Sequence, residues 1–196
     1  INIAEGIGAG IIMDGKLFKG AYGRAGEFGH LSVDINGPMC ACGNRGCIDC
    51  FLKKSAILSA FREACERNDS SLKDVFGDEE VTYAGIRRAL DAGDIQALIV
   101  AYHLAEKLAL AISNLICMFN PEKIVLGGGV EELGPTFFSI VRNCVMSSAS
   151  KGTMWARKLT LSYTSLTGHA ENLGAAKYFL DQIFTFPFRR QGQLFL

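Results

Sequence analysis

The most informative stretch of the sequence opens with Gly26-Glu27-Phe28-Gly29-His30 and closes with Cys40-Ala41-Cys42-Gly43-Asn44-Arg45-Gly46-Cys47. It contains one histidine and three cysteines in the spacing His-x9-Cys-x-Cys-x4-Cys. One imidazole and three thiolates make up a closed tetrahedral ligand set that suits zinc. The loop around them is rich in glycine and has few apolar residues, so a bound metal could supply the stabilisation that packing does not. The spacing therefore favours a zinc site formed by His30, Cys40, Cys42 and Cys47.

Three other interpretations of this stretch remain open on spacing alone. The cysteines could be reduced residues of an ordinary loop, with His30 merely nearby. They could form a disulfide, either Cys40–Cys47 or Cys42–Cys50. Cys50 is also a rival fourth ligand, although we expect its side chain to pack inward.

The number and spacing of the cysteines indicate the cellular compartment in which the protein works. The sequence has seven cysteines, an odd number of which four crowd together, and this argues against a simple disulfide framework. Cys65, Cys117 and Cys144 stand among apolar residues, and we predict that they are small buried hydrophobic side chains. Free thiols of this kind indicate a reducing compartment, the cytoplasm.

The composition limits the classes of protein to which the chain can belong. Its 196 residues suit one large domain or two small ones, with enough length to bury a core. The formal net charge is zero, so the charge balance by itself indicates no nucleic-acid-binding surface. We find no run of about 18 apolar residues and predict no membrane span. The chain begins at Ile1 without an initiator methionine or a signal-peptide pattern, so we expect it to be part of a longer protein.

The pattern of apolar residues predicts strands near both ends of the chain and helices between them. Residues 1–5 and 9–13 read as strands, and Asp14-Gly15 is a strong signal for a hairpin with residues 16–18. Residues 20–50 form a long loop. The predicted helices cover 55–67, 82–92, 94–119, 136–146 and 170–184, and the later strands cover 123–126 and 159–163. Strands followed by glycines and helices predict an α/β fold with a doubly wound sheet.

The longest predicted helix runs from a cap at Asp94 to the residues before Asn120-Pro121. It is apolar on most sides, so we expect it to be deeply buried, with His103 packed in the core. His169, before the last helix, is expected in a turn.

The cysteine stretch also resembles a known family. Its two halves are similar to the Gly-Glu-x-Gly-His and Cys-x-Cys-Gly-x-x-Gly-Cys motifs of the ROK family, the bacterial group of sugar repressors and sugar kinases. Glu5 to Gly10, Asn120 to Gly129 and Gly174-Ala175-Ala176 also stand where the family has them. The resemblance reaches to about residue 184.

The resemblance implies the fold class and the layout of the chain. The expected fold is α/β, the C-terminal lobe of an actin-like ATPase (ribonuclease H-like) pair with a zinc-binding loop inserted. We expect a single domain over residues 1–196. Its parts would be a zinc loop at about 26–50, a helical segment at about 54–119, an α/β segment at about 120–184 and an apolar tail at 185–196.

The same resemblance implies a sugar-binding site beside the zinc ion. It assigns sugar contacts to Glu27, His30 and Asp49, and zinc coordination to the four residues already named. Carboxylates accept hydrogen bonds from sugar hydroxyls, and a metal-bound histidine keeps its second ring nitrogen as an N–H donor. Asp49 departs from the family, which usually has Glu there, so the shorter side chain puts the identity of the sugar in doubt.

Two glycine-rich turns would face a nucleotide in kinase members of the family. Gly6 and Gly8 match the second phosphate-contacting turn, and Gly127 and Gly128 match the adenosine-side turn. Tight packing of a strand against a helix explains the second turn equally well. A dinucleotide-binding motif is disfavoured around Gly6, because a hairpin strand rather than a helix is predicted next. Kinase members commonly have a hydroxyl residue before the first glycine, whereas this chain has Glu5, whose charge would repel a triphosphate.

These features favour one function and leave a second open. The chain is expected to be the sugar-effector-binding and oligomerisation domain of a ROK transcriptional regulator, with no catalytic residues of its own. Its partners would be a sugar or sugar phosphate, further copies of itself, and DNA bound through an N-terminal domain that is not in this chain. The alternative is the C-terminal lobe of a ROK sugar kinase that uses ATP and Mg²⁺. The family's Asp base and first phosphate loop, which a kinase needs, are not in this chain.

Overall fold

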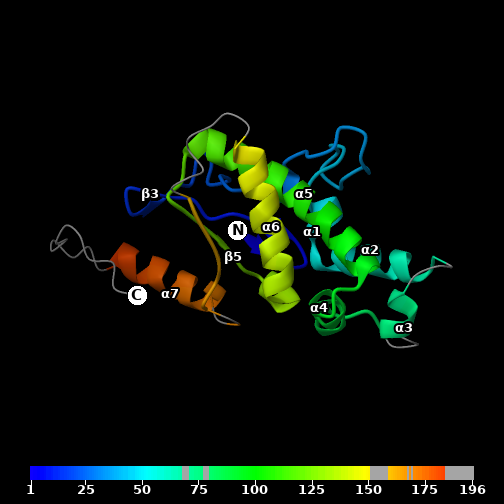
Figure 1. Ribbon diagram of the computed structural model, residues 1–196. Helices are drawn as coiled ribbons and strands as arrows, with labels where there is room; N and C mark the ends of the chain where they lie inside the picture. The colour runs from blue at the N-terminus through cyan, green and yellow to red at the C-terminus, as the bar shows by residue number, and fades with distance from the viewer. Residues whose placement is uncertain (68–70, 77–79, 151–158, 167, 169, 184–196) are drawn as a thin grey trace. The chain divides into compact units, whose positions relative to one another are not determined.

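The computed structural model describes residues 1–67, 71–76, 80–150, 159–166, 168 and 170–183 (Figure 1). It divides into two compact units, Ile1–Thr164 and Ser165–Leu196. The first unit contains the sheet, the helices α1 to α6 and the cysteine loop. The second contains α7 (Ala170–Ile183). His169 and the predicted apolar tail at 185–196 lie outside the described residues, and the single-domain layout stays a prediction.

The chain start is built into a small mixed sheet. The strands β1 (Asn2–Ile3) and β2 (Ile7–Gly8) pair antiparallel, and β5 (Lys123–Leu126) and β6 (Thr160–Tyr163) pair parallel. β1 also meets the end of β5, where the Ile3 N–H donates to the Gly127 carbonyl at 2.7 Å and the Gly127 N–H donates to the Ile1 carbonyl at 2.9 Å. The order β2-β1-β5-β6 confirms an α/β fold with parallel strands at its centre.

A second pair of strands forms the predicted hairpin. β3 (Ile12–Met13) and β4 (Lys16–Leu17) pair antiparallel across Asp14 and Gly15. Both turn residues have positive φ, 51° for Asp14 and 69° for Gly15, which is the conformation that a two-residue hairpin turn requires.

The helices follow the capping signals of the sequence closely. The middle of the chain forms α1 (Asp49–Leu52), α2 (Lys54–Cys65), α3 (Leu72–Phe76), α4 (Tyr83–Asp91) and α5 (Ile95–Phe119), and α6 (Gly134–Ser150) follows β5. The hydroxyl of Thr82 accepts from the Gly85 N–H at 3.2 Å and the Asp94 carboxylate accepts from the Ala97 N–H at 2.8 Å, so both predicted caps are confirmed. Short 3-10 turns lie at Phe28–His30 (η1) and Val130–Leu133 (η2), and neither these turns nor α3 were predicted.

Helix α5 forms the centre of the core but buries only one of its faces. Nine of its residues are buried, and the helix packs against α2, α4 and α6. The opposite face is exposed, and the prediction that His103 packs in the core is wrong. Its side chain is 72% exposed and its Nδ1 atom lies 3.6 Å from the Glu106 carboxylate. The burial of His103 was predicted wrongly because α5 has apolar residues on both faces, and composition does not show which face meets the core.

The packing of the helices decides the burial of the three scattered cysteines, and it also bears on whether α5 could span a membrane. Cys144 is buried as predicted, Cys65 is half-buried, and Cys117 is exposed, contrary to the prediction. By length and composition α5 could cross a membrane, although no run of that kind was found in the sequence alone. The core helix of a soluble protein meets the same criteria, and nine residues of α5 are buried against the core.

Candidate metal centre

The cysteine loop folds back on itself and brings its two ends together. Ser32 and Cys47 form an antiparallel bridge, and Met39 and Arg45 form a second one. Between them the Cys40 N–H donates to the Asn44 carbonyl at 2.8 Å, which closes a tight turn. This turn aims Cys40 and Cys42 in one direction, towards the end of η1.

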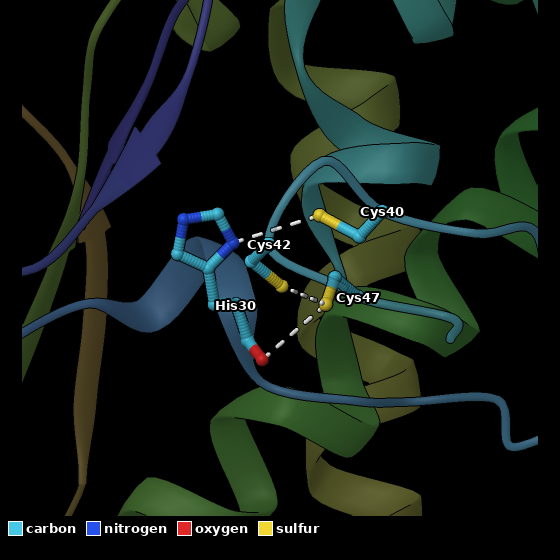
Figure 2. Close-up of side chains that lie close together, drawn as sticks. All are labelled: His30, Cys40, Cys42 and Cys47. Carbon is cyan, nitrogen blue, oxygen red and sulfur yellow. Dashed lines mark hydrogen bonds between the residues drawn. The ribbon is translucent and has the colours of Figure 1, made fainter. Parts of the chain in front are cut away.

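The four predicted ligands lie together (Figure 2). The Nδ1 atom of His30 is 3.6 Å from the Cys40 sulfur, and the Cys42 and Cys47 sulfurs are 3.6 Å apart. All four ligand atoms lie within 4.8 Å of one another. A tetrahedral zinc ion, with bonds of about 2.3 Å to sulfur and about 2.0 Å to nitrogen, would hold two sulfurs about 3.8 Å apart and a sulfur and a nitrogen about 3.5 Å apart. The donor set and its spacing therefore fit a metal ion of that size.

The rival interpretations of the loop fare less well. All seven cysteines are free, so the structure contains neither a Cys40–Cys47 nor a Cys42–Cys50 disulfide. Cys50 is half-buried on α1 and does not belong to the group of four.

The thiols differ in how readily they lose a proton. A hydrogen bond from the backbone N–H of Cys42 lowers the pKa of the Cys40 thiol to about 6. Burial raises the pKa of the Cys47 thiol to about 12. Cys40 therefore offers a thiolate at neutral pH, whereas Cys47 needs a cation beside it before it becomes a good ligand.

A lysine of α5 forms an ion pair with the cysteine loop. The Lys107 ammonium donates to the Asp34 carboxylate at 2.7 Å and lies 4.7 Å from the centre of the Phe51 ring. The hydrogen bond from Lys107 lowers the pKa of Asp34. This contact spans 73 positions and was not predicted, although Lys107 is the only basic residue besides His103 in α5.

Close backbone packing holds the other side of the loop. Gly46 has a φ of 63°, and a Cβ atom there would lie 1.7 Å from the backbone oxygen of Asp34. Around it, the Val33 N–H donates to the Gly46 carbonyl and the Ile48 N–H donates to the Leu31 carbonyl, at 2.8 and 2.9 Å. The glycine before Cys47 is therefore required by the fold of the loop.

The three residues expected to contact sugar lie around the end of η1. Glu27 is exposed immediately before η1, and His30 ends it. Asp49 begins α1, where its carboxylate accepts from the Ile7 N–H at 2.8 Å and lies against Gly29. Because His30 directs Nδ1 at the thiols, its Nε2 atom points away from them (Figure 2).

The two glycine turns both lie next to β1. Gly6 lies in the turn between β1 and β2, and Gly8 ends β2. Gly127 and Gly128 follow β5, and a Cβ atom at Gly128 would lie 2.6 Å from the backbone nitrogen of Ile3. Close packing against β1 thus accounts for Gly128, while nucleotide contact by these four glycines stays a prediction.

Acidic residues lie next to both turns. Glu5 precedes Gly6, and the Glu131 carboxylate accepts from the Gly129 N–H at 3.0 Å. Burial, followed by the negative charges of Glu132, Glu5 and Glu131, raises the pKa of the Tyr83 hydroxyl. One cation lies in the same region, because the Lys54 ammonium is 5.7 Å from the centre of the Tyr83 ring.

The chain is thus an α/β protein that gathers one histidine and three cysteines in a single loop, where they could hold a metal ion. The chain belongs to the ROK family, whose family model matches residues 1–182. It is 30% identical over 191 residues to the xylose repressor of Caldicellulosiruptor bescii, covering 95% of this chain and 47% of the repressor. It is 32% identical over 185 residues to the glucokinase of Thermotoga maritima, covering 93% of this chain and 58% of that enzyme.

A solved structure shows the same fold. The ROK-family glucokinase of Streptomyces griseus, solved with glucose and AMPPNP, has a TM-score of 0.80 at 27% identity and covers 90% of this chain and 58% of its own. The chain spans about half the length of the curated relatives it matches. These relatives include both repressors and sugar kinases.

Proposed function

We propose that this chain is the sugar-effector-binding and self-associating part of a ROK-family transcriptional regulator, held by a structural zinc ion on His30, Cys40, Cys42 and Cys47. The full-length protein would bind DNA through another domain and act in the cytoplasm. Sugar binding would change its affinity for DNA.

The geometry of the cysteine loop supports zinc. The spacing of the four ligand atoms agrees with a tetrahedral ion, and the loop has little apolar packing of its own. When bound, zinc would tie η1 to the turn at Cys40 and Cys42 and supply stability rather than chemistry.

The arrangement of polar groups beside the loop supports a sugar as ligand. His30 would bind zinc through Nδ1, which leaves Nε2–H as a fixed hydrogen-bond donor. Asp49, held by the Ile7 N–H through one oxygen, keeps its other oxygen for a sugar hydroxyl. Glu27 is exposed, so its carboxylate is accessible to a ligand. One donor and two carboxylate acceptors match the alternating hydroxyls of a sugar.

The carboxylates beside the glycine turns are the observation that favours a regulator over a kinase. Glu5 precedes Gly6, and the Glu131 carboxylate accepts from the Gly129 N–H at 3.0 Å. Carboxylates at this place would repel the phosphates of a nucleotide, which kinases bind with neutral hydroxyls, backbone amides and cations. The similarity to the Streptomyces griseus glucokinase favours the alternative, the C-terminal lobe of an ATP-dependent sugar kinase.

A coupled kinase assay on the full-length protein separates the two functions. With common hexoses and their amino derivatives, ATP and Mg²⁺, we expect no turnover approaching about one per second, the lower end for working kinases. Turnover at or above that rate would overturn the regulator proposal. The variant Glu5→Thr should bind ATP more tightly than the unchanged protein, because it removes one charge from the turn.

Sugar binding is measured separately, by calorimetry with the same sugars. The best-bound sugar should shift the midpoint of binding to operator DNA in a mobility assay. A protein that binds sugar without any effect on DNA binding would contradict the regulatory part of the proposal.

A further inference from the structure

The three thiols of the metal centre differ in how far solvent can reach them. Cys42 is exposed, whereas Cys40 and Cys47 are only 8% and 0% exposed. Cys42 lies within the tight turn that the Cys40 N–H closes on the Asn44 carbonyl. The oxidation of a cysteine follows its thiolate character and its exposure. Because a metal would hold all three sulfurs as thiolates, exposure decides between them, and a small oxidant in solution meets Cys42 first.

The nearest partner for an oxidised Cys42 is a second ligand of the same metal centre. The Cys42 and Cys47 sulfurs are 3.6 Å apart (Figure 2). Cys47 is held in place, since it forms a bridge with Ser32 and follows Gly46, which packs closely against the backbone of Asp34.

The turn that carries Cys42 has more room. Its neighbour Gly43 has nothing within 4 Å of the position that a Cβ atom would take. A small shift of this turn would therefore bring the Cys42 sulfur onto the Cys47 sulfur while the rest of the loop keeps its packing.

Cys50 is the rival partner. It is half-buried on α1, and its N–H donates to the Cys47 carbonyl at 2.9 Å, so it stands one turn further along the chain. Its sulfur does not belong to the group of four ligand atoms. The direct contact between Cys42 and Cys47 therefore favours Cys47 over Cys50.

We propose that Cys42 is a peroxide-sensitive thiol, and that its oxidation joins it to Cys47 in a disulfide and empties the metal centre. The inference rests on the proposed zinc site and adds a covalent modification to it. In a reducing compartment the thiols stay free and the metal stays bound, whereas hydrogen peroxide reverses both conditions.

The reaction has two steps and consumes one molecule of hydrogen peroxide. The Cys42 thiolate attacks a peroxide oxygen, the O–O bond breaks, and a sulfenic acid and a hydroxide ion form. The Cys47 thiolate then attacks the Cys42 sulfur, the S–O bond breaks, and a second hydroxide ion leaves. The two sulfurs lose two electrons and the two peroxide oxygens gain them. Only His30 and Cys40 then remain as ligands, because it is the thiolate that binds a metal.

Loss of the metal would affect the sugar-binding residues through His30. The metal would hold this ring through Nδ1, which keeps Nε2–H in a fixed direction. Without that bond the ring is free to turn, so the oxidised protein should bind sugar more weakly. A thiol reductant and added zinc should restore the site, because a disulfide is reversible whereas a sulfinic acid is not.

Zinc release from the full-length protein gives the first test. Fully reduced protein, loaded with zinc and freed of reductant, is treated with hydrogen peroxide in the presence of a chromophoric zinc indicator. We expect one zinc ion to be released for each disulfide that forms. A protein that keeps its zinc while Cys42 is oxidised, or that releases zinc while Cys42 is still reduced, would overturn the proposal.

Mass spectrometry identifies the bond. Trypsin cleaves after Arg45 and so separates Cys42 from Cys47, and the expected disulfide appears as two joined peptides. Fragmentation then distinguishes Cys42 from Cys40 and Cys47 from Cys50. A disulfide that joins Cys42 to Cys40 or to Cys50 would refute the assignment of Cys47.

Matched variants test which thiol starts the reaction. Cys42→Asp keeps a negatively charged ligand and removes the oxidisable sulfur, so peroxide should release its zinc about tenfold or more slowly than from the unchanged protein, once the release without peroxide is subtracted. Cys117→Ser removes the exposed cysteine of α5 and should leave the rate of release unchanged. Cys50→Ser should do the same, and slower release from it would contradict the choice of Cys47. Should Cys42→Asp hold too little zinc, the peptide map of the unchanged protein still decides.

Failure of the metal site and failure of this inference give different results. Fully reduced protein that binds no zinc contradicts the proposed metal centre before any peroxide is added. Protein that binds zinc but forms no Cys42–Cys47 disulfide contradicts the inference alone.

Discussion

Replacing Gly46 with alanine should cost the loop most of its metal affinity, and replacing Gly43 with alanine should cost far less. Both glycines have positive φ, 63° and 92°, so each alanine adds about 1–2 kcal/mol of backbone strain. At Gly43 nothing lies within 4 Å of the new Cβ atom, and strain is the whole effect. At Gly46 the new atom would lie 1.7 Å from the Asp34 oxygen, and the strands of the loop must separate.

The extra cost at Gly46 follows from the hydrogen bonds that the separation disturbs. The bonds from the Val33 N–H and the Ile48 N–H flank this position, and each contributes about 1 kcal/mol. The total of about 3–4 kcal/mol corresponds to a loss of about 150- to 1,000-fold in zinc affinity for Gly46→Ala. Gly43→Ala should lose about 5- to 30-fold.

Competition with a chromophoric zinc chelator measures both affinities on fully reduced protein. Hydrogen exchange over residues 31–48 then reports whether the loop has opened. Equal zinc affinities for Gly46→Ala and Gly43→Ala would refute the reasoning from the Asp34 contact. Absence of stoichiometric zinc from the unchanged protein would refute the metal site itself.

Three further substitutions test the site from other sides. Cys42→Ser should remove zinc, measured by elemental analysis, and should speed hydrogen exchange over residues 34–50 while the helices keep their protection. Asp49→Asn should weaken sugar binding by about tenfold or more in calorimetry, since a hydrogen bond to a charged group is worth about 1.5–3 kcal/mol. Lys107→Met should raise the pKa of Asp34 towards its ordinary value of 3.8, as followed by NMR titration. Because that pKa is lowered in the folded protein, the Lys107–Asp34 ion pair stabilises the loop above pH 3.8, and this stabilisation is lost as the pH falls through the lowered pKa. An unchanged titration of Asp34 in the variant would contradict this role of Lys107.

Local signals in the sequence predicted local structure well. Asp14-Gly15, Thr82 and Asp94 each act on residues within four positions, and the turn and both caps form as predicted. The four ligand residues come together for a related reason. They lie within 18 positions of one another, and a loop of that length closes at small entropic cost.

Features that depend on distant parts of the chain were not predictable in the same way. The contact between Lys107 and Asp34 spans 73 positions, and the one between Asp49 and Ile7 spans 42. No local sequence pattern predicts either contact. The exposure of His103 was missed because α5 is apolar on both faces, so its sequence does not identify the face that meets the core.

The position of Lys107 on α5 has a consequence for how metal binding and global stability depend on each other. Lys107 donates to Asp34 of the cysteine loop from a helix that nine buried residues hold in the core. An ion that binds only the closed loop would therefore stabilise the folded chain as a whole, by an amount that rises with the concentration of free metal. Chelation should then lower the temperature at which α5 unfolds as well as opening the loop.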